Sequence, residues 1–480
     1  MERATATGTV SRRILIAVVV CACIVVVVRL WPIVGRPVGD GPDGQNLGLW
    51  GSLARNLLRV GPRASHMGLQ SPNISDAPYI DHPPLLPWLL AAAWSVTGVR
   101  PGVARGLIVL LGSIPATIGL CGTVRAVTRS TWATASATMA FALSRAMVSF
   151  GAMVDTWTLG LGPALLFTWL LVDPMALSHA RRRAAIGVLA AASVMLSWLG
   201  FAMVGLACLA AIHRRWRRLS VVGDQTMVIA AVAAAAVVAS VLGTVGSQSG
   251  LLHVVGSRTG KSDALAAARF SWESFTDLLG PVGVAGCAVV LACLLLTPAS
   301  TRGLRPLFGA CAVWSGFLDG GSIPFWHYWW AAVGCIGLGL AVHHALRVEA
   351  RATYRWLAAG ALSVAALGGM RTNSEDQVFL ARWGASVGVR AWPEAQPTAW
   401  ILSRPQFVSW VEFDADRRAE TVSVTQLRAL ASSRPLDAVA VTPNGVHPGL
   451  CVGRSNHLIV VPIAEAVAAL DGREIRACAT

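Results

Sequence analysis

A run of polar residues separates strongly apolar segments near the start of the chain. Asp43, Gln45 and Asn46 form this run, Arg55 follows it, and His82 precedes two prolines. Ionisable side chains beside bilayer-spanning segments are energetically costly and mark functional sites. A carboxylate in this position can take a proton from a hydroxyl group, and an arginine can bind a phosphate oxygen. These residues therefore predict chemistry at a membrane surface.

Each of these residues also has a structural explanation. Asp43 lies in the sequence Asp-Gly-Pro-Asp-Gly, which is typical of turns. Arg55 falls on an amphipathic helix predicted over Leu47 to Leu58, from which it either binds phosphate or extends its guanidinium to the membrane surface. His82 is held in extended backbone by the proline after it, and either donates a hydrogen bond or closes the loop.

Further polar residues occur later in the chain. Asp155 precedes an apolar segment, where it either serves the chemistry or caps a helix that begins at Thr156. Arg258 and Lys261 lie in a loop, where they either bind a phosphate or diphosphate or are solvated loop charges.

A histidine followed by three aromatic residues begins a late apolar segment. An aromatic belt at the membrane interface explains Tyr328, Trp329 and Trp330, but it does not explain His327. We therefore include His327, with the adjacent Tyr328, among the candidate substrate-binding residues.

A metal site is a further alternative. No ligand spacing is diagnostic of a metal, and neither a GxGxxG nor a P-loop pattern occurs. A divalent metal is compatible with the sequence but not indicated, and no cofactor is predicted. The candidate ligands would be Asp40, Asp43, Asp76, Asp81 and His82.

The composition sets the class of protein. Of the 480 residues, 55% are hydrophobic and 13% are charged, and the mean hydropathy is +0.59. These values indicate an α-helical polytopic membrane protein. The net charge of +15 arises from arginines in short runs between apolar segments. Such runs set membrane topology, and they argue against nucleic acid as a partner.

Apolar segments of roughly 15 to 23 residues predict about eleven transmembrane helices. The first follows Arg12 and Arg13 and is predicted to be a retained signal anchor after a cytoplasmic N-terminus of residues 1–13. The predicted spans are Ile14 to Val34, Ala104 to Val124, Trp132 to Phe150, Trp157 to Val172, Ala184 to Leu196, Leu199 to Ile212, Thr226 to Val245, Leu278 to Leu296, Leu304 to Leu318, Trp326 to His344 and Trp356 to Met370.

The arginines decide how a further apolar segment, Leu85 to Val99, is placed. If this segment does not cross the membrane, the arginine clusters that follow all lie in the cytoplasm, and if it crosses they all lie outside. It is therefore predicted to be a re-entrant or interfacial helix on the outer face. The same rule makes Ala184 to Ile212 a hairpin that turns at Ser197. On this topology the outer face carries a catalytic loop of residues 35–102, Asp155, the loop 246–277 and His327.

After Met370 the chain has ordinary charge density. We therefore predict a membrane domain over residues 14–370 and a small extracytoplasmic α/β domain over residues 371–480, in which Cys451 and Cys478 can form a disulfide. Its predicted strands and helices are Ala399 to Leu402, Phe407 to Val411, Val424 to Ala431, Ala438 to Val441, Leu458 to Val461 and Ala464 to Leu470.

Four segments of the sequence resemble the C-type, polyprenyl-phosphate-dependent glycosyltransferases. More narrowly, they are similar to the bacterial membrane proteins grouped with protein O-mannosyltransferases and aminoarabinose transferases. The segments are DGQNLGLWGSLARNLLRVG from Asp43, YIDHPPLLPWLLAAAWSVTG from Tyr79, FGAMVD ending at Asp155, and HYWW from His327. They occur in the family's order and on the predicted outer face, and the resemblance covers residues 12–370.

The resemblance implies an inverting transfer of a sugar from a polyprenyl monophosphate to an acceptor. It assigns Asp43 as the base that deprotonates the acceptor, Asp155 as the family's second-loop aspartate, and His82 and His327 as the matching histidines. Many members carry paired acids where this chain has Asp43 followed by glycine, so the second carboxylate is unassigned. Mannose or arabinose passing to protein, lipid or cell-wall glycan are all compatible.

The leading hypothesis is a multi-pass glycosyltransferase of the cell membrane, whose partners are the lipid-linked donor, the acceptor and membrane lipids. A transporter or flippase of a lipid-linked glycan is the first alternative, although such a protein more often has charges within its spans or repeated halves. A non-catalytic scaffold of the cell envelope is the second alternative.

Overall fold

The chain divides into two compact units. The helical unit comprises Met1–Val34, Ile80–Leu86 and Arg105–Asp376, and the second unit comprises Gly35–Tyr79, Pro87–Ala104 and Gln377–Thr480. The computed structural model describes residues 2–35, 42–70, 79, 82–173, 176–216, 222–245, 264–296, 301–317, 327–348, 396, 398–402, 418–434, 437–441 and 459–471.

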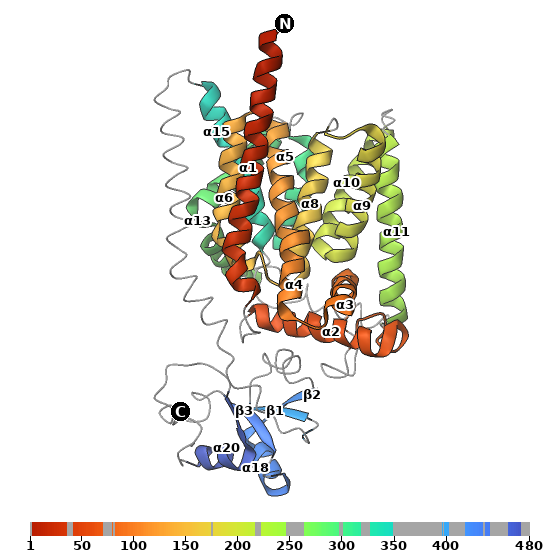
Figure 1. Cartoon of the computed structure of the whole chain (residues 1–480), viewed down its shortest axis with the longest axis vertical. Helices are drawn as coiled ribbons and strands as arrows, with labels where there is room; N and C mark the ends of the chain where they lie inside the picture. The colour runs from red at the N-terminus through yellow and green to blue at the C-terminus, as the bar shows by residue number, and fades with distance from the viewer. Residues whose placement is uncertain are drawn as a thin grey trace. The chain divides into compact units, whose positions relative to one another are not determined.

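Packed helices form the helical unit, with α5, α8, α9 and α10 side by side (Figure 1). Two short elements, a π-helical turn over Val109–Ser113 and a 3₁₀ turn over Arg302–Leu304, interrupt the series. The helices are α1 (Glu2–Val34), α5 (Ile114–Thr128), α6 (Thr131–Leu143), α7 (Arg145–Phe150), α8 (Thr156–Val172), α9 (His179–Leu196), α10 (Trp198–Trp216), α11 (Val222–Val245), α13 (Ala264–Leu296), α14 (Arg305–Phe317) and α15 (Tyr328–Val348).

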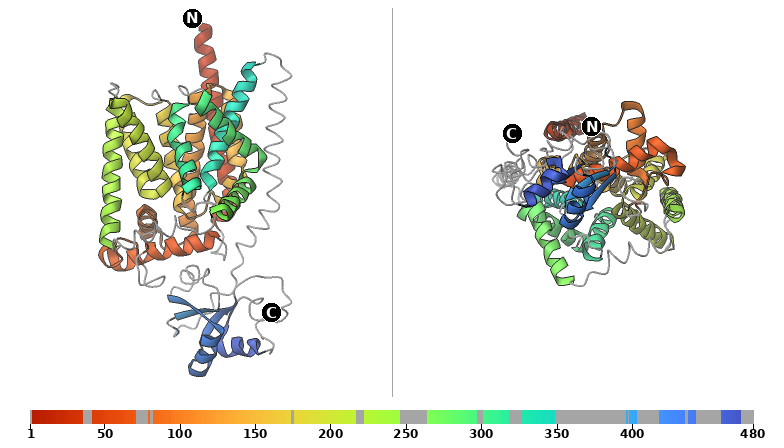
Figure 2. Two further views of the ribbon diagram at one scale, coloured as in Figure 1. Left: turned by 180° about the vertical axis from the view of Figure 1, so that it is seen from behind. Right: turned by 90° about the horizontal axis from the view of Figure 1, so that it is seen from below.

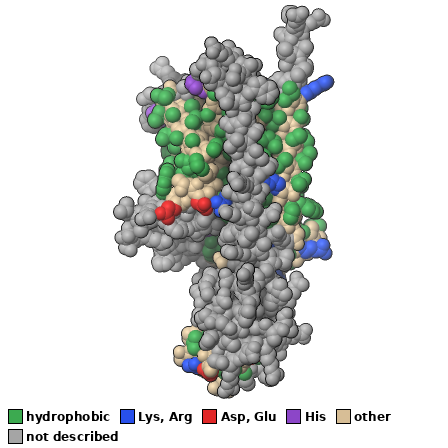
Figure 3. Space-filling model, turned by 90° about the vertical axis from the view of Figure 1, so that its left-hand side faces the viewer, with side chains coloured by type: hydrophobic (Ala, Val, Ile, Leu, Met, Phe, Trp, Pro, Cys, Tyr) green, Lys and Arg blue, Asp and Glu red, His purple; other side chains and the backbone are tan. Residues whose placement is uncertain are grey.

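Among the described residues, five helices are long and apolar enough to cross a membrane. Three shorter helices are also apolar, and on the face shown in Figure 3 hydrophobic side chains cover most of the described helical surface. The predicted span Trp356 to Met370 lies outside the described residues. The five segments are Arg13–Val34, Pro101–Thr128, Gln225–Gly243, Phe275–Leu296 and Tyr328–Leu346.

Serine residues end helices at two places in the helical unit. Ser197 lies between α9 and α10 in extended backbone, and its hydroxyl accepts a hydrogen bond from the Gly200 amide at 3.0 Å. This turn confirms the predicted hairpin. The predicted span Trp132 to Phe150 is instead broken at Ser144, because the Ser144 hydroxyl accepts from the Met147 amide and starts α7 as a separate helix.

Helix α13 contains a sharp bend and packs closely against α15. Gly280 has a φ of 63°, a left-handed conformation that glycine adopts without strain. The segment before this bend lies across the axis of the helix bundle (Figure 2). Beyond the bend, a Cβ atom built on Gly286 would overlap the Gly334 carbonyl, so the two backbones meet without intervening side chains.

Arginine side chains donate hydrogen bonds between helices at both ends of the helical unit. At one end, Arg29 donates to the Leu143 carbonyl at 2.8 Å and Arg105 donates to the Ile33 carbonyl at 3.2 Å, which joins the end of α1 to α6 and to α4 (Pro101–Ile108). At the other end Arg182 donates to the Leu170 carbonyl at 3.1 Å. The helix ends that carry Arg125 and Arg129 after α5, Arg181 to Arg183 near the start of α9, and Arg302 and Arg305 at the start of α14 all lie at this second end.

The first part of the second unit is helical. Helix α2 (Pro42–Ala64) includes the amphipathic helix predicted over Leu47 to Leu58 and is longer than predicted. It ends in a tight turn that holds the next helix, because the Trp88 indole donates to the Met67 carbonyl at 2.6 Å. Helices α3 (Leu85–Thr97) and α4 (Pro101–Ile108) follow, and both have residues in each unit. At 1.5 Å per residue the 13 residues of α3 span about 20 Å, which is too short for a hydrocarbon core of about 30 Å.

A four-stranded sheet forms the C-terminal part of the second unit, with strand order β2-β1-β3-β4. β1 pairs in parallel with β2 and β3, whereas β4 is antiparallel to β3. Five of the six predicted elements are present, the sixth, Phe407 to Val411, lies outside the described residues, and β2 was not predicted. The elements are β1 (Thr398–Leu402), β2 (Arg418–Val422), α18 (Val424–Ser433), β3 (Ala438–Val441), β4 (Ile459–Pro462) and α20 (Ile463–Leu470).

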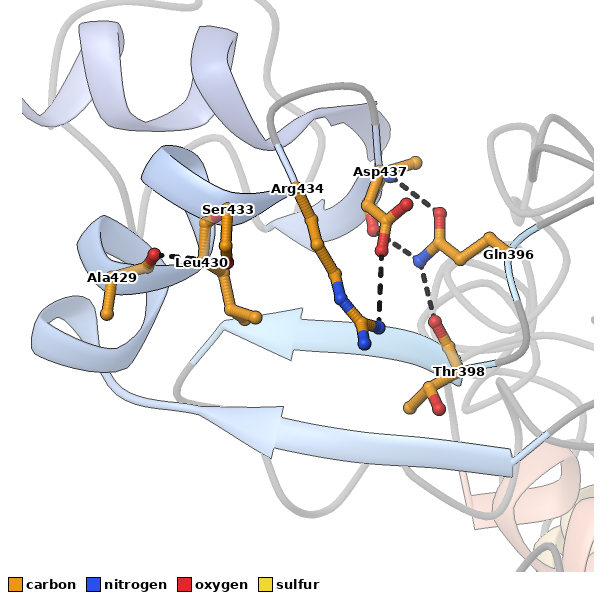
Figure 4. A network of polar contacts seen from close by, with 8 residues as sticks. Gln396, Thr398, Ala429, Leu430, Ser433, Arg434 and Asp437 are labelled. Atoms are coloured by element: carbon orange, nitrogen blue, oxygen red, sulfur yellow. Dashed lines mark hydrogen bonds and ion pairs between the residues drawn. The ribbon is translucent and has the colours of Figure 1, made fainter.

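A buried glutamine joins the starts of β1 and β3 (Figure 4). The Gln396 amide nitrogen donates to the carbonyls of Thr398 at 2.6 Å and Ala438 at 2.9 Å, and its oxygen accepts from the Ala438 amide at 2.7 Å. One side chain thus replaces a pair of backbone hydrogen bonds where the parallel strands begin. The core beneath them is apolar and includes Leu427, Val439 and Ile463.

Candidate functional site

Asp155 is the N-cap of α8. Its backbone is extended, and its Oδ1 accepts a hydrogen bond from the Trp157 amide at 2.8 Å. The side chain is buried, with 3% of the residue exposed. The helix dipole places partial positive charge at this position, and the capping bond satisfies one of the first backbone amides of α8. The capping interpretation of Asp155 is therefore correct, and any chemistry by this carboxylate is carried out from a capping position.

His327 begins the segment that leads into α15 and is also buried. The residue is 1% exposed, and the Phe275 ring from α13 meets it edge to face at a centroid distance of 5.8 Å. Tyr328 is completely buried, and its hydroxyl donates to the Met147 sulfur at 3.5 Å. These contacts pack the start of α15 against both α7 and the segment of α13 before its bend.

A pair of tryptophans joins Asp155 to the start of α15. The Trp329 indole nitrogen donates to the Trp157 carbonyl at 2.8 Å, and the Trp157 amide is the group that binds Asp155. The Trp157 ring lies on the Trp314 ring at a centroid distance of 4.7 Å. Asp155 and His327, which are 172 positions apart, are thus brought to neighbouring helix ends.

The aromatic-belt interpretation of Trp329 and Trp330 is wrong. Belt residues present their rings to the membrane interface, whereas Trp329 is completely buried and Trp330 is 8% exposed. Both indoles bind other helices, since Trp330 donates to the Ser315 hydroxyl at 2.9 Å. Sequence reasoning missed this role because hydropathy does not separate a tryptophan between helices from one that faces lipid.

The structure places the other predicted residues in two groups. His82 is buried at 8% exposure in the helical unit, just before the prolines that lead into α3. Asn46 and Arg55 lie on α2 in the second unit, where Asn46 is half-buried and Arg55 is 8% exposed. Asp43 is in the first turn of α2, and its side chain lies outside the described residues.

Two predicted phosphate ligands and most of the candidate metal ligands lie outside the described residues. Among the residues that are described, no three histidine, cysteine, aspartate or glutamate side chains converge as a metal site would require. His82 is the one candidate ligand whose side chain is described. The residues outside the description are Asp40, Asp76, Asp81, Arg258, Lys261, Cys451 and Cys478.

Arg105, which was not predicted as a site residue, stabilises the end of the helical unit at which Asp155 and His327 lie. Arg105 is 2% exposed and donates to the Ile33 carbonyl at the end of α1. Ser113, also buried, donates to the Gly151 carbonyl at 2.6 Å in the loop that leads to Asp155. Buried polar groups are stable only with hydrogen-bond partners, so these contacts fix the backbone around the candidate site.

Comparison with known proteins gives a match in structure and none in sequence. No protein-family model matches the chain, and no curated protein matches it. The crystal structure of ArnT from Cupriavidus metallidurans bound to undecaprenyl phosphate is similar, with a TM-score of 0.56 and 15% identity. That similarity covers 95% of this chain and 98% of ArnT.

The archaeal oligosaccharyltransferase AglB from Archaeoglobus fulgidus is also similar. Its complex with an inhibitory peptide and a dolichol-phosphate has a TM-score of 0.55 and 12% identity over 90% of this chain and 69% of AglB. The oligosaccharyltransferase from the same organism in the apo form has a TM-score of 0.50 and 14% identity. The chain therefore has the C-type glycosyltransferase fold, which confirms the predicted fold class, including a small C-terminal sheet.

Proposed function

We propose that this chain is an integral-membrane glycosyltransferase that moves a sugar from a polyprenyl-phosphate donor to an acceptor at the outer face of the cell membrane. The observation that carries the proposal is the similarity to ArnT over nearly the full length of both chains. ArnT is bound to undecaprenyl phosphate and AglB to a dolichol-phosphate, so both neighbours bind a lipid phosphate of the proposed donor class.

The proposed orientation rests on the arginines. The helix ends at one end of the helical unit carry Arg125, Arg129 and the run Arg181 to Arg183, and positive residues accumulate on the cytoplasmic side of a membrane. The opposite end, with Asp155 and His327, then faces outward. This orientation supports an active site that meets its donor outside the cell. We propose that residues 371–480 lie outside as well, because an odd number of predicted spans precedes them.

The proposed reaction is a direct displacement at the anomeric carbon. The acceptor hydroxyl oxygen bonds to this carbon while the bond to the phosphate oxygen breaks, and the electron pair leaves on the lipid phosphate. Asp43 takes the hydroxyl proton. Its place in the first turn of α2 suits an ionised carboxylate, because the helix dipole stabilises negative charge there. Arg55, Arg258 and Lys261 are the proposed cations that stabilise the departing phosphate.

Asp155 is the second proposed catalytic residue, and the other site residues are proposed to hold the substrates. The Trp157 amide fixes Oδ1 of Asp155, so the carboxylate has a defined direction in which to contact the sugar at the reacting centre. Asn46, His82 and His327 are proposed hydrogen-bonding partners of the sugar or the phosphate. Tyr328 is proposed to act beside His327, where its own hydroxyl contacts Met147.

The test uses the purified full chain in proteoliposomes that contain polyprenyl-phosphate mannose or polyprenyl-phosphate arabinose. We expect release of free polyprenyl phosphate together with a new glycoconjugate when an envelope extract supplies the acceptor. Movement of intact donor across the bilayer without cleavage would identify a flippase instead. An unchanged set of envelope glycans in cells that lack the protein, with no donor cleaved in vitro, would reject the enzyme and leave the scaffold.

A further inference from the structure

We infer that Trp329 is a positioning residue, which holds the Asp155-capped start of α8 in register with His327. The inference rests on the proposed function, because it concerns how two residues of that site keep their relative places. The sequence had assigned Trp329 only to an aromatic belt, and the inference gives this residue a role in the site.

Two hydrogen bonds of the Trp157 backbone carry the inference. The Trp157 amide donates to the Asp155 carboxylate at 2.8 Å, and the Trp157 carbonyl accepts from the Trp329 indole at 2.8 Å. Trp157 therefore connects the cap of α8 to the first turn of α15. His327 is two residues before Trp329, so the same indole bond also fixes where His327 lies.

Because both tryptophans are buried, the hydrogen bond between them constrains the position of the start of α8. Trp329 is completely buried and Trp157 is 1% exposed, so water does not replace a lost indole donor. The Trp157 carbonyl keeps its hydrogen bond within α8 when the indole is removed, so the loss is that of the direct hydrogen bond from this turn of α8 to α15. A displacement on the order of 1 Å at a reacting centre lowers rates by about a hundredfold.

Packing holds the Trp329 ring in one orientation. A Cβ atom built on Gly160 of α8 would lie 3.4 Å from Cζ2 of this ring and 3.1 Å from the Ser197 hydroxyl. The Trp329 ring therefore lies within van der Waals reach of the α8 backbone at Gly160. From α14, Trp314 packs on Trp157, so the start of α8 is supported by two helices.

The adjacent Trp330 provides a matched control. It is also buried, and its indole also makes one hydrogen bond, but the acceptor is Ser315 of α14. Replacing either tryptophan with phenylalanine removes one indole donor and keeps an aromatic ring on the same helix. The two variants therefore differ in whether the bond to α8 is lost.

The experiment compares Trp329→Phe and Trp330→Phe in the full chain, first by hydrogen–deuterium exchange in nanodiscs. We expect the amides of residues 153–160 to exchange at least about fivefold faster in Trp329→Phe, because opening of this helix start no longer breaks the indole bond. Trp330→Phe should leave this segment unchanged. Equal exchange of residues 153–160 in the two variants would overturn the inference whatever the protein's activity.

The second measurement is sugar transfer by the same two variants. We expect Trp329→Phe to lower kcat about tenfold to a hundredfold, because it displaces the Asp155 carboxylate from the reacting centre, and to raise KM for the donor by a smaller factor, because His327 shifts with it. An Asp155→Asn background should remove this effect. Full additivity of the two substitutions, or an unchanged kcat with faster exchange, would overturn the positioning role.

These readouts also separate the inference from the proposed function. If wild-type protein cleaves no polyprenyl-phosphate donor, the proposed function fails and the catalytic part of the inference fails with it. The exchange comparison still decides whether Trp329 holds α8. If Trp329→Phe does not fold, benzothienylalanine at position 329 keeps a bicyclic ring of the same shape and removes only the indole N–H, and it should speed exchange in the same direction.

Discussion

Helix α8 has an aspartate at each end, and the two are held very differently. Asp155 at its start is 3% exposed and binds the Trp157 amide, whereas Asp173 at its end is half-buried and follows the last helical residue. A carboxylate is stabilised by the helix dipole at the first position and destabilised at the second, by about 0.3–1 kcal/mol each. The same residue type therefore has a favourable and an unfavourable place on one helix.

The surroundings of the two aspartates differ in the same way. Asp155 lies among buried polar and aromatic groups, which include Ser113, Trp157 and Trp329. Asp173 lies at the end where Arg182 binds the Leu170 carbonyl and where the connections are rich in arginine. We interpret the first end as the place of chemistry and the second as the place that sets topology.

The largest expected effect tests the proposed base of the reaction. Asp43→Asn removes the proposed base, and we expect the transfer rate to fall about 10²- to 10⁴-fold. Donor cleavage in proteoliposomes measures this rate. The variant should insert and unfold like the wild type, and a fully active Asp43→Asn protein would remove Asp43 from the mechanism.

The next effect tests how tightly α15, which begins just after His327, packs against α13. Gly286→Ala places a methyl group on the Gly334 carbonyl, which is backbone and does not yield, so we expect a loss of about 1–3 kcal/mol in stability. Thermal unfolding in detergent measures the change. Gly205→Ala in α10 is the control, since nothing lies within 4 Å of its Cβ, and it should gain about 1 kcal/mol from helix propensity. Equal stability of the two variants would show that the α13–α15 contact is loose.

A smaller effect separates the two aspartates of α8 by stability alone. Asp155→Ala removes the cap and should cost about 1 kcal/mol, whereas Asp155→Asn keeps a capping oxygen and should cost little. Asp173→Ala should cost nothing or stabilise slightly, because it removes negative charge from the end of the helix. The same unfolding assay compares all three. A loss in Asp173→Ala as large as that in Asp155→Ala would abolish the distinction between the two ends.

The smallest effect concerns an exposed contact beside the site. Arg145 and Asp277 form an ion pair at 3.1 Å with side chains that are 31% and 71% exposed. We expect Arg145→Gln to cost less than about 1 kcal/mol, and this cost should fall further in high salt. Unfolding measured at low and high salt tests this, and a larger, salt-independent loss would mean that the pair contributes to the packing of α13.

Sequence reasoning predicted features that carry a clear local signal. The hairpin at Ser197 was predictable because arginines flank both helices, and the serine supplies a cap. The helices of the C-terminal part were predictable from their periodicity, and α18 begins with a capping box of Ser423 and Gln426. β2 was missed because it is an edge strand with charged residues, which the search for apolar runs does not detect.

Features that depend on neighbouring helices were not predictable. The break at Ser144 is an exception, because Ser144 and Arg145 are a local signal that hydropathy averaged over Trp132 to Phe150 conceals, so one span was predicted where the structure has two helices. The choice between cap and base for Asp155 was open, because both uses require an aspartate before a helix. The role of Trp329 depends on its distance from Trp157, which is set only when α8 and α15 pack together.

The most direct test of the whole account is sugar transfer from a polyprenyl-phosphate donor by wild type, Asp155→Asn and Asp173→Asn in proteoliposomes. Both variants replace a carboxylate with an amide on the same helix. We predict that Asp155→Asn loses at least about a hundredfold in rate while Asp173→Asn stays within about twofold of wild type. An Asp155→Asn protein as active as wild type, or an equal loss in both variants, would contradict a catalytic site at the start of α8.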